Sequence, residues 1–267
     1  MYTASFRYLR AASLAEAEAL FAKTPDARYI AGGQTLIPTM KQRLAAPAAL
    51  IDVSRIATSS FIRRERGMLV IGSSTRHADV AASSDVREAL PALAHLAGVI
   101  GDPAVRHRGT LGGSVANNDP AADYPAAVLA LGATVKTTRR TIAADQFFTG
   151  LFQTALADGE LISEIAFPIS QRAGYAKFPH PASRYALVGV FAAQLEDGVR
   201  VAVTGAAPCV FRVAPMEQAL SKGFTPGAVA GIAVDADGLN SDLFGSAEYR
   251  AHLVTVMAKR AVAAALG

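Results

Sequence analysis

The stretch Arg28-Tyr29-Ile30-Ala31-Gly32-Gly33-Gln34-Thr35-Leu36 predicts the first unit of the fold. Arg28–Ala31 has the pattern of a short strand, and the two glycines then turn the chain sharply into a helix expected from about Thr35 to Arg43. Glycine permits a positive φ and lets a ligand approach the backbone closely. The exposed N–H groups and the dipole of a helix N-terminus favour an anion such as a phosphate. Taken alone, however, a Gly-Gly pair is more often only a turn.

The sequence on either side of this turn continues the same alternation of strands and helices. Phe6–Leu9 and Ala49–Val53 are expected to be strands. Ser13 with Glu16 three positions later is a capping box, which predicts a helix that runs through Phe21. Residues 1–57 are therefore expected to form a small α/β unit.

A longer α/β unit is expected over residues 58–170. Its predicted strands are Phe61–Arg63, Met68–Ile71, Ala133–Thr138 and Leu161–Phe167, and its predicted helices are Arg76–Ala82, Pro91–Val99 and Ala122–Leu131. Pro168 and the polar stretch Ser170–Gly174 mark the expected boundary of this unit.

Residues 171–267 show strands first and helices afterwards, which is typical of an α+β domain. The expected strands are Tyr175–Phe178, Tyr185–Leu195 and Val199–Ala206, with Asp197-Gly198 as a hairpin signal between the last two. The expected helices are Ala214–Lys222, Pro226–Ile232 and Glu248–Leu266.

A second glycine-rich segment, Arg108-Gly109-Thr110-Leu111-Gly112-Gly113-Ser114-Val115-Ala116-Asn117, lies in the middle unit. We expect Gly109–Gly113 to form a loop whose backbone cradles a ligand, although a tight structural loop explains the same residues equally well. Asp119 is a candidate cap for the following helix. Asp123 is a candidate partner for ribose hydroxyls, and a carboxylate that only stabilises the helix dipole is the alternative.

Composition and missing motifs exclude several classes of protein. The chain has 51% hydrophobic and 18% charged residues, which indicates a folded globular protein. Its single cysteine, Cys209, excludes an internal disulfide, an iron–sulfur cluster and a cysteine-based zinc site. The five histidines lack metal-ligand spacing, and neither a dinucleotide fingerprint of the Rossmann type nor a Walker A loop is present. We therefore name no catalytic and no metal-binding residue.

Charge and hydropathy give the expected location. The net charge of +4 comes from scattered basic residues without the aromatic interleaving of nucleic-acid modules, so no nucleic-acid partner is expected. The longest apolar stretches are too short to span a bilayer, and the N-terminal residues lack the apolar core of a signal peptide. A cytoplasmic protein is the expectation.

The two glycine segments, in this order and with Asp119-Pro120-Ala121-Ala122-Asp123 after the second, resemble the FAD-binding medium subunits of molybdenum hydroxylases. This is the flavoprotein family of xanthine dehydrogenase and carbon monoxide dehydrogenase. The resemblance covers nearly the whole chain and extends to Leu161–Ile165, Tyr175–Phe178 and Ser183–Gly189.

The resemblance implies a fold and a set of cofactor contacts. It implies an α+β fold in which a two-subdomain FAD-binding domain of the vanillyl-alcohol-oxidase type (1–57 and 58–170) precedes a small α+β C-terminal domain (171–267). Asp123 would hold the ribose, Lys177 would approach the flavin ring, and Tyr185 would pack beside that ring or be an ordinary strand tyrosine. The remaining implied FAD contacts are Ala31, Gly32, Gly33, Gln34, Thr35, Leu36, Ile100, Thr110, Gly112, Gly113, Ser114, Leu161 and Ile162.

The function implied by the resemblance is electron transfer. A large partner subunit would carry the molybdenum cofactor, a small one would carry [2Fe–2S] clusters, and FAD on this chain would pass electrons to an external acceptor such as NAD, oxygen or a quinone. The implied assembly is a dimer of three-subunit units. Alternatives are a free-standing FAD-dependent oxidase and a non-redox nucleotide-binding or assembly module.

Two positions depart from the pattern of the family. His107 stands where members commonly carry Asn, and Pro179-His180-Pro181 is an unusual stretch close to the expected flavin edge. The four-cysteine loop that some members use for an extra iron–sulfur cluster is absent.

Overall fold

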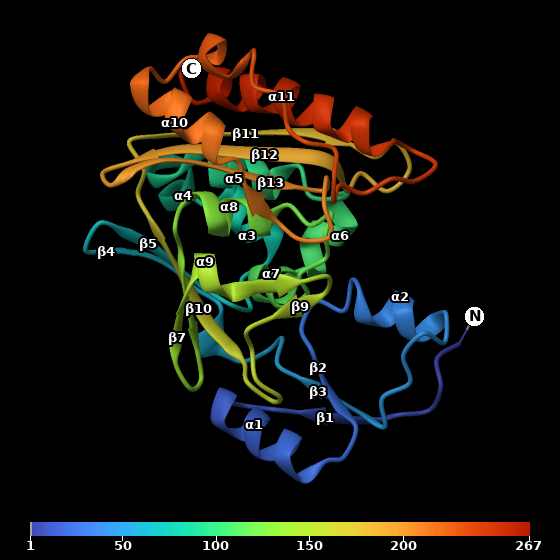
Figure 1. Cartoon of the computed structure of the whole chain (residues 1–267). Coiled ribbons are helices and arrows are strands. Elements are labelled where there is room, and N and C mark those ends of the chain that lie inside the picture. Colours follow the sequence, from blue (N-terminus) through green and yellow to red (C-terminus); the bar gives the residue numbers. More distant parts are fainter. Residues whose placement is uncertain (1) are drawn as a thin grey trace.

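The computed structural model describes residues 2–267 and contains three main sheets that follow one another along the chain (Figure 1). The first sheet is parallel, has the order β1-β3-β2, and lies at the bottom of Figure 1. Its strands and associated helices are β1 (Arg7–Arg10), α1 (Leu14–Lys23), β2 (Ala27–Ile30), α2 (Leu36–Lys41) and β3 (Ala49–Asp52), followed by the short 3-10 helix η1 (Ala57–Ser59).

The second sheet is antiparallel, with the order β4-β5-β10-β6-β7, and forms the middle of the molecule. Its strands are β4 (Ile62–Glu65), β5 (Met68–Gly72), β6 (Thr134–Thr137), β7 (Thr141–Ala143) and β10 (Ile162–Pro168). The helices inserted between β5 and β6 are α3 (His77–Ala82), α4 (Ser84–Ala89), α5 (Pro91–Gly98), α6 (Pro103–Arg108), α7 (Leu111–Asn117) and α8 (Tyr124–Ala130). After β7 come α9 (Ala144–Phe147) and a small hairpin of β8 (Phe148–Gly150) and β9 (Gln153–Thr154).

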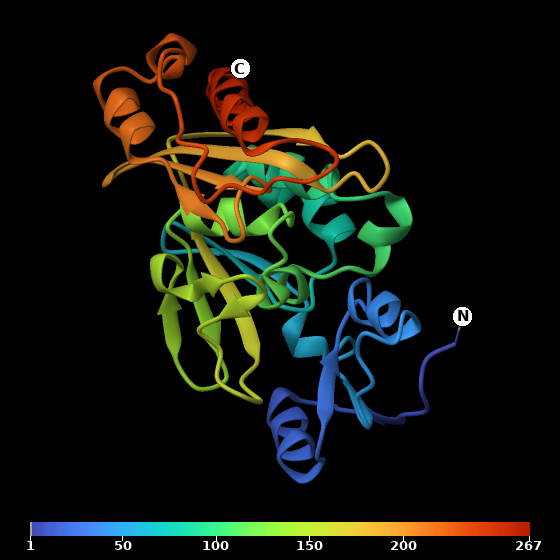
Figure 2. The same ribbon diagram turned by 45° about the vertical axis from the view of Figure 1, so that its right-hand side comes forward.

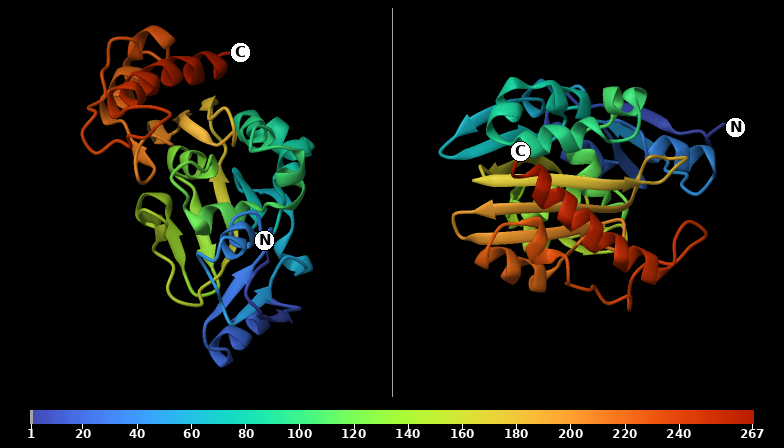
Figure 3. Two further views of the ribbon diagram at one scale, coloured as in Figure 1. Left: turned by 90° about the vertical axis from the view of Figure 1, so that its right-hand side faces the viewer. Right: turned by 90° about the horizontal axis from the view of Figure 1, so that it is seen from above.

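The third sheet, β11-β12-β13-β14, lies between two helical layers (Figures 1 and 2). Its strands are β11 (Arg172–Pro179), β12 (Ala186–Leu195), β13 (Gly198–Thr204) and β14 (Phe211–Arg212). Helices α5 and α8 of the middle unit contact one face, and α10 (Ala214–Lys222) and α11 (Ala247–Ala264) contact the other. In the right-hand view of Figure 3, α11 crosses the strands of this sheet diagonally. The 3-10 helix η2 (Pro226–Val229) packs between α10 and α11.

Both faces of β12 are buried, which explains why its residues are almost all apolar. Every residue of this strand except Gln194 is buried. Because side chains alternate between the two faces of a strand, Phe191 and Ala193 join the core of the middle unit, whereas Val190 and Ala192 join the core beneath α11. The C-terminal sheet is thereby fixed to the middle unit through a continuous apolar core.

Most of the elements expected from the sequence are present, and the α+β fold class is confirmed. The helix start at the capping-box signature is confirmed, since Ser13 is the N-cap and its Oγ accepts from Glu16 N–H at 3.1 Å. The Glu16 carboxylate, however, accepts from Ala12 N–H at 2.7 Å, one residue before the N-cap. The β12–β13 hairpin forms, although its two loop residues are Glu196 and Asp197 and Gly198 already begins β13. The three predicted ranges each contain one of the main sheets, and their status as domains stays a prediction.

Several local expectations were wrong. Gly109–Gly113 is not a loop, because α7 begins at Leu111 inside it. Asp119 does not cap α8; its Oδ1 accepts a hydrogen bond from Ala121 N–H at 2.9 Å and shapes the turn before that helix. The helix expected over Pro226–Ile232 is only the one-turn η2.

Candidate functional site

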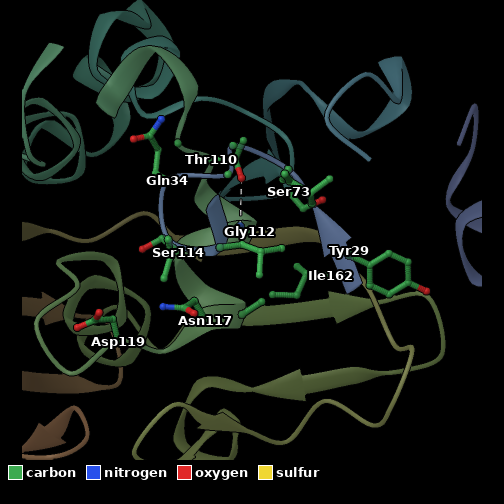
Figure 4. Close-up of a pocket in the computed structure, with 18 of the residues that line it drawn as sticks. Tyr29, Gln34, Ser73, Thr110, Gly112, Ser114, Asn117, Asp119 and Ile162 are labelled. Atoms are coloured by element: carbon green, nitrogen blue, oxygen red, sulfur yellow. Dashed lines mark hydrogen bonds between the residues drawn. The ribbon is translucent and has the colours of Figure 1, made fainter. Parts of the chain in front are cut away.

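A cavity of about 900 Å³ opens between the N-terminal unit, the middle unit and the loop that joins β11 to β12 (Figure 4). Both glycine segments reach it, although 72 or more residues separate them in the sequence. The structure brings together every predicted site residue except Lys177: Ala31, Gly32, Gly33, Gln34, Thr35, Leu36, Ile100, Thr110, Gly112, Gly113, Ser114, Asp123, Leu161, Ile162 and Tyr185 all line the cavity.

The first glycine segment presents its backbone to the cavity. Gly33 has a φ of +72°, a conformation that glycine adopts without strain. Within residues 2–267, the N–H groups of Gly32, Gly33, Gln34 and Thr35 have no hydrogen-bond acceptor. Consecutive free N–H groups in a turn form a concave site that favours anions. This turn therefore fits the phosphate-binding role expected of it.

The second glycine segment has a different role from the one expected. Thr110 caps α7, and its Oγ1 accepts from Gly113 N–H at 3.1 Å. The N–H groups of Leu111 and Gly112 donate to Thr75 O and Ser73 O. The backbone donors of this first turn are consequently occupied, and the segment offers side chains such as Thr110 and Ser114 instead.

The glycines of the second segment serve close packing. A Cβ on Gly112 would lie 2.6 Å from Ser73 Cβ, and a Cβ on Gly109 would lie 2.5 Å from His77 Nε2. A Cβ on Gly32, in the first segment, would lie only 2.3 Å from Arg108 O. The glycines therefore allow the two segments to meet at the wall of the cavity.

Asp123 lies at the cavity wall in a buried ion pair. Its Oδ1 accepts from Tyr175 OH at 2.5 Å and lies 2.9 Å from Lys177 Nζ, which also donates to Val99 O at 2.7 Å. Complete burial raises the pKa of Asp123, and the ammonium group of Lys177 opposes this effect. Lys177 does not line the cavity itself; its ammonium group contacts Asp123, which does, and its approach to the flavin ring stays a prediction.

One end of the cavity is aromatic and apolar. Phe21 and Tyr29 stack with ring centroids 4.9 Å apart, and Tyr29 OH donates to Gly159 O at 3.0 Å across the boundary of the first two units. Leu161, Ile162, Ile100 and Tyr185 also line the cavity. Apolar walls of this kind suit planar ring systems.

Sequence reasoning missed several lining residues. Ser73 and Ser74 follow β5 directly, and His77 begins α3. Small polar residues at the end of a buried strand were the available signal for the two serines. His77 is buried, its Nδ1 has no partner within the described chain, and desolvation lowers the pKa of its imidazole to about 4. No sequence pattern identified His77 as a residue of the cavity wall.

Within residues 2–267, no group of His, Cys, Asp and Glu side chains is arranged to hold a metal ion. No helix in the described part of the chain has the length and apolar character needed to cross a membrane.

The comparisons with known proteins agree with this site. Residues 4–170 match the family described as the FAD binding domain in molybdopterin dehydrogenase. The chain is 37% identical to the carbon monoxide dehydrogenase medium chain of Hydrogenophaga pseudoflava, over 97% of this chain and 96% of that protein. It is 34% identical to the nicotine 6-hydroxylase medium subunit of Paenarthrobacter nicotinovorans, over 97% of this chain and 96% of that protein.

Solved structures give the same result. The carbon monoxide dehydrogenase structure from Hydrogenophaga pseudoflava contains a chain that matches with a TM-score of 0.89 at 36% identity, over 100% of this chain and 99% of that one. The structure of quinoline 2-oxidoreductase from Pseudomonas putida 86 contains a chain that matches with a TM-score of 0.91 at 29% identity. The match covers 99% of this chain and 98% of that one. The chain therefore belongs to the FAD-binding medium-subunit family of molybdopterin dehydrogenases, and is an oxidoreductase component.

Proposed function

We propose that this chain is the electron-transfer subunit of a molybdenum hydroxylase complex, in which FAD in the large cavity accepts electrons from [2Fe–2S] clusters of a small partner subunit and passes them to an external acceptor. A large partner subunit would hold the molybdenum cofactor and hydroxylate the substrate. Relatives named as medium chains of carbon monoxide and glyceraldehyde dehydrogenases support this division of work. A cytoplasmic location belongs to the same proposal.

The residues of the cavity fit FAD. A volume of about 900 Å³ lies within the range of sites for large organic ligands. The free N–H groups of Gly32 to Thr35 suit the diphosphate, and the hydroxyls of Thr110 and Ser114 add donors close by. The apolar and aromatic side chains of the wall suit planar ring systems. This convergence of phosphate-type donors and apolar walls in one cavity is the observation that carries the proposal.

The chain's own residues bind and tune the cofactor and perform no proton transfer in this account. When bound, FAD supplies the capacity to take up and release two electrons. The turn at Gly32 and Gly33 would hold the diphosphate, and Asp123 would orient a ribose or ribityl hydroxyl from the wall. Lys177 would act through Asp123, because its ammonium group opposes the rise in the pKa of that carboxyl that burial causes.

The proposal is tested by purifying the complex in its native form and identifying its subunits and cofactors by mass. We expect FAD at about one per chain, together with a large and a small subunit. A lone chain that oxidises substrates with its own FAD would favour the free-standing oxidase. A chain that neither contains nor accepts FAD would contradict the account of the site.

A further inference from the structure

The unusual Pro179-His180-Pro181 stretch lies where β11 ends and the loop to β12 begins. The imidazole Nδ1 of His180 accepts hydrogen bonds from the N–H groups of Ala182 and Ser183, each at 3.2 Å. The main chain closes the same loop, since His180 N–H donates to Tyr185 O at 2.7 Å. One imidazole therefore satisfies two of the N–H groups at the tip of this loop.

This arrangement fixes the protonation of His180. Backbone N–H groups only donate, so Nδ1 must carry a lone pair, and the neutral ring then carries its proton on Nε2. The prolines on both sides support the geometry: proline fixes its own φ, and a residue before proline is held in an extended conformation. The loop is thus built around a neutral histidine of a single tautomer.

The other side of the imidazole is anchored to the turn before α11. The rings of His180 and Phe244 lie edge to face, with centroids 4.0 Å apart. Phe244 N–H donates to Asp242 Oδ1 at 2.9 Å, and Arg250 Nη2 donates to Asp242 Oδ2 at 2.7 Å. Arg250 is buried and also donates to Leu187 O, so the turn is fixed to β12.

The loop is a shared wall between two cavities. Ser183 and Tyr185 line the large cavity, and both also line a second cavity of about 310 Å³. His180 and Arg250 belong to the lining of the second cavity only. A shift of the loop would consequently change the width of the large cavity at Tyr185.

We propose that His180 is a positioning residue, whose neutral imidazole holds the β11–β12 loop against Phe244 and so keeps Ser183 and Tyr185 in place at the wall of the FAD site. The proposal rests on the proposed function only where it concerns FAD. The clamp itself, meaning the two hydrogen bonds to Nδ1 and the contact with Phe244, is a property of the chain alone.

The test uses two variants of the full chain. One removes the hydrogen-bond acceptor of His180, and the other removes its ring. His180→Asn keeps an acceptor near the position of Nδ1, whereas His180→Phe keeps a ring against Phe244 without an acceptor. His252→Ala, on the exposed side of α11, is the control. We expect His180→Phe to release FAD about tenfold faster, the change that loss of one to two net hydrogen bonds would produce. His180→Asn keeps the acceptor and loses only the ring contact with Phe244, so its rate should lie between those of the wild type and His180→Phe. His252→Ala should keep the wild-type rate.

Two further readouts do not need FAD. Nitrogen-15 NMR of the wild-type chain should show His180 protonated on Nε2 alone, and amide exchange at Ala182 and Ser183 should accelerate in His180→Phe but not in His180→Asn. An Nδ1-protonated His180, or equal exchange in the two variants, would overturn the clamp. If amide exchange differs between the two variants as expected but both release FAD at the same rate, the role of the clamp at the cavity would be overturned. A wild-type chain that binds no FAD would contradict the proposed function while the NMR experiments still test the clamp.

Discussion

Lys177 Nζ lies 2.9 Å from Asp123 Oδ1, and the two side chains are only 6% and 4% exposed. Removal of one partner from a buried ion pair leaves the other charge uncompensated, which costs about 3–5 kcal/mol. We therefore expect Lys177→Met to lower the free energy of unfolding by about this amount, as measured by urea denaturation. Lys136→Met is the matched control, because its exposed pair with Glu164 should contribute less than about 1 kcal/mol. Equal losses in the two variants would contradict the importance of the buried pair.

Contact between the two glycine segments predicts the effect of Gly32→Ala. Its Cβ would lie 2.3 Å from Arg108 O, so the segments must move apart at the wall of the cavity. We expect FAD affinity to fall by at least about tenfold, measured by flavin titration of the purified chain. Gly231→Ala is the control, because nothing lies within 4 Å of its added Cβ. An unchanged FAD affinity in Gly32→Ala would show that the contact does not shape the site.

The pH dependence of stability should contain a contribution from His77. Burial lowers the pKa of His77 to about 4 in the folded chain, whereas the unfolded chain has the ordinary value of 6.5. The unfolded state therefore binds a proton first, and stability falls as the pH drops from 6.5 to about 4. The difference corresponds to roughly 3 kcal/mol. His77→Gln should have a shallower fall in unfolding free energy between these pH values, and parallel curves for the two proteins would refute this explanation.

Asn118 holds the β8–β9 hairpin beside the cavity. Its Nδ2 donates to Gly150 O and Gln153 O, each at 2.8 Å, and its φ is +44°. Asn118→Ala should increase amide exchange over the hairpin, because both bonds are lost and alanine is strained at this φ. Asn118→Gly loses the same bonds and relieves the strain, so it should be more stable than the alanine variant by about 1 kcal/mol. Wild-type exchange in both variants would exclude the proposed anchoring.

The sequence predicted the regular elements well and the detailed contacts poorly. Hydrophobic periodicity identified the strands close to the first glycine turn, and the capping signature identified α1. Both signals are local in the sequence. The sequence also identified both glycine segments as parts of one site, but only through a family resemblance. Periodicity gave no sign that the turn after β2 meets the end of α6 at Gly32.

The remaining errors arose from tertiary contacts. Gly112 and Gly113 suggested a loop, yet Ser73 and Thr75 supply acceptors for the first turn of α7, and this allows a helix to form there. Lys177 was expected to approach the flavin ring, which stays a prediction, and its contacts with Asp123 and Val99 O were not foreseen. Partners that lie distant in the sequence decided both outcomes, and no local pattern identifies them.

The absorption spectrum of the purified chain, followed by titration with FAD, shows directly whether this cavity binds FAD. We expect an oxidised-flavin spectrum, with FAD released on denaturation at about one per chain, or saturable uptake of added FAD by a colourless preparation. A folded chain that is colourless and also fails to bind added FAD would contradict the claim that this cavity is an FAD site.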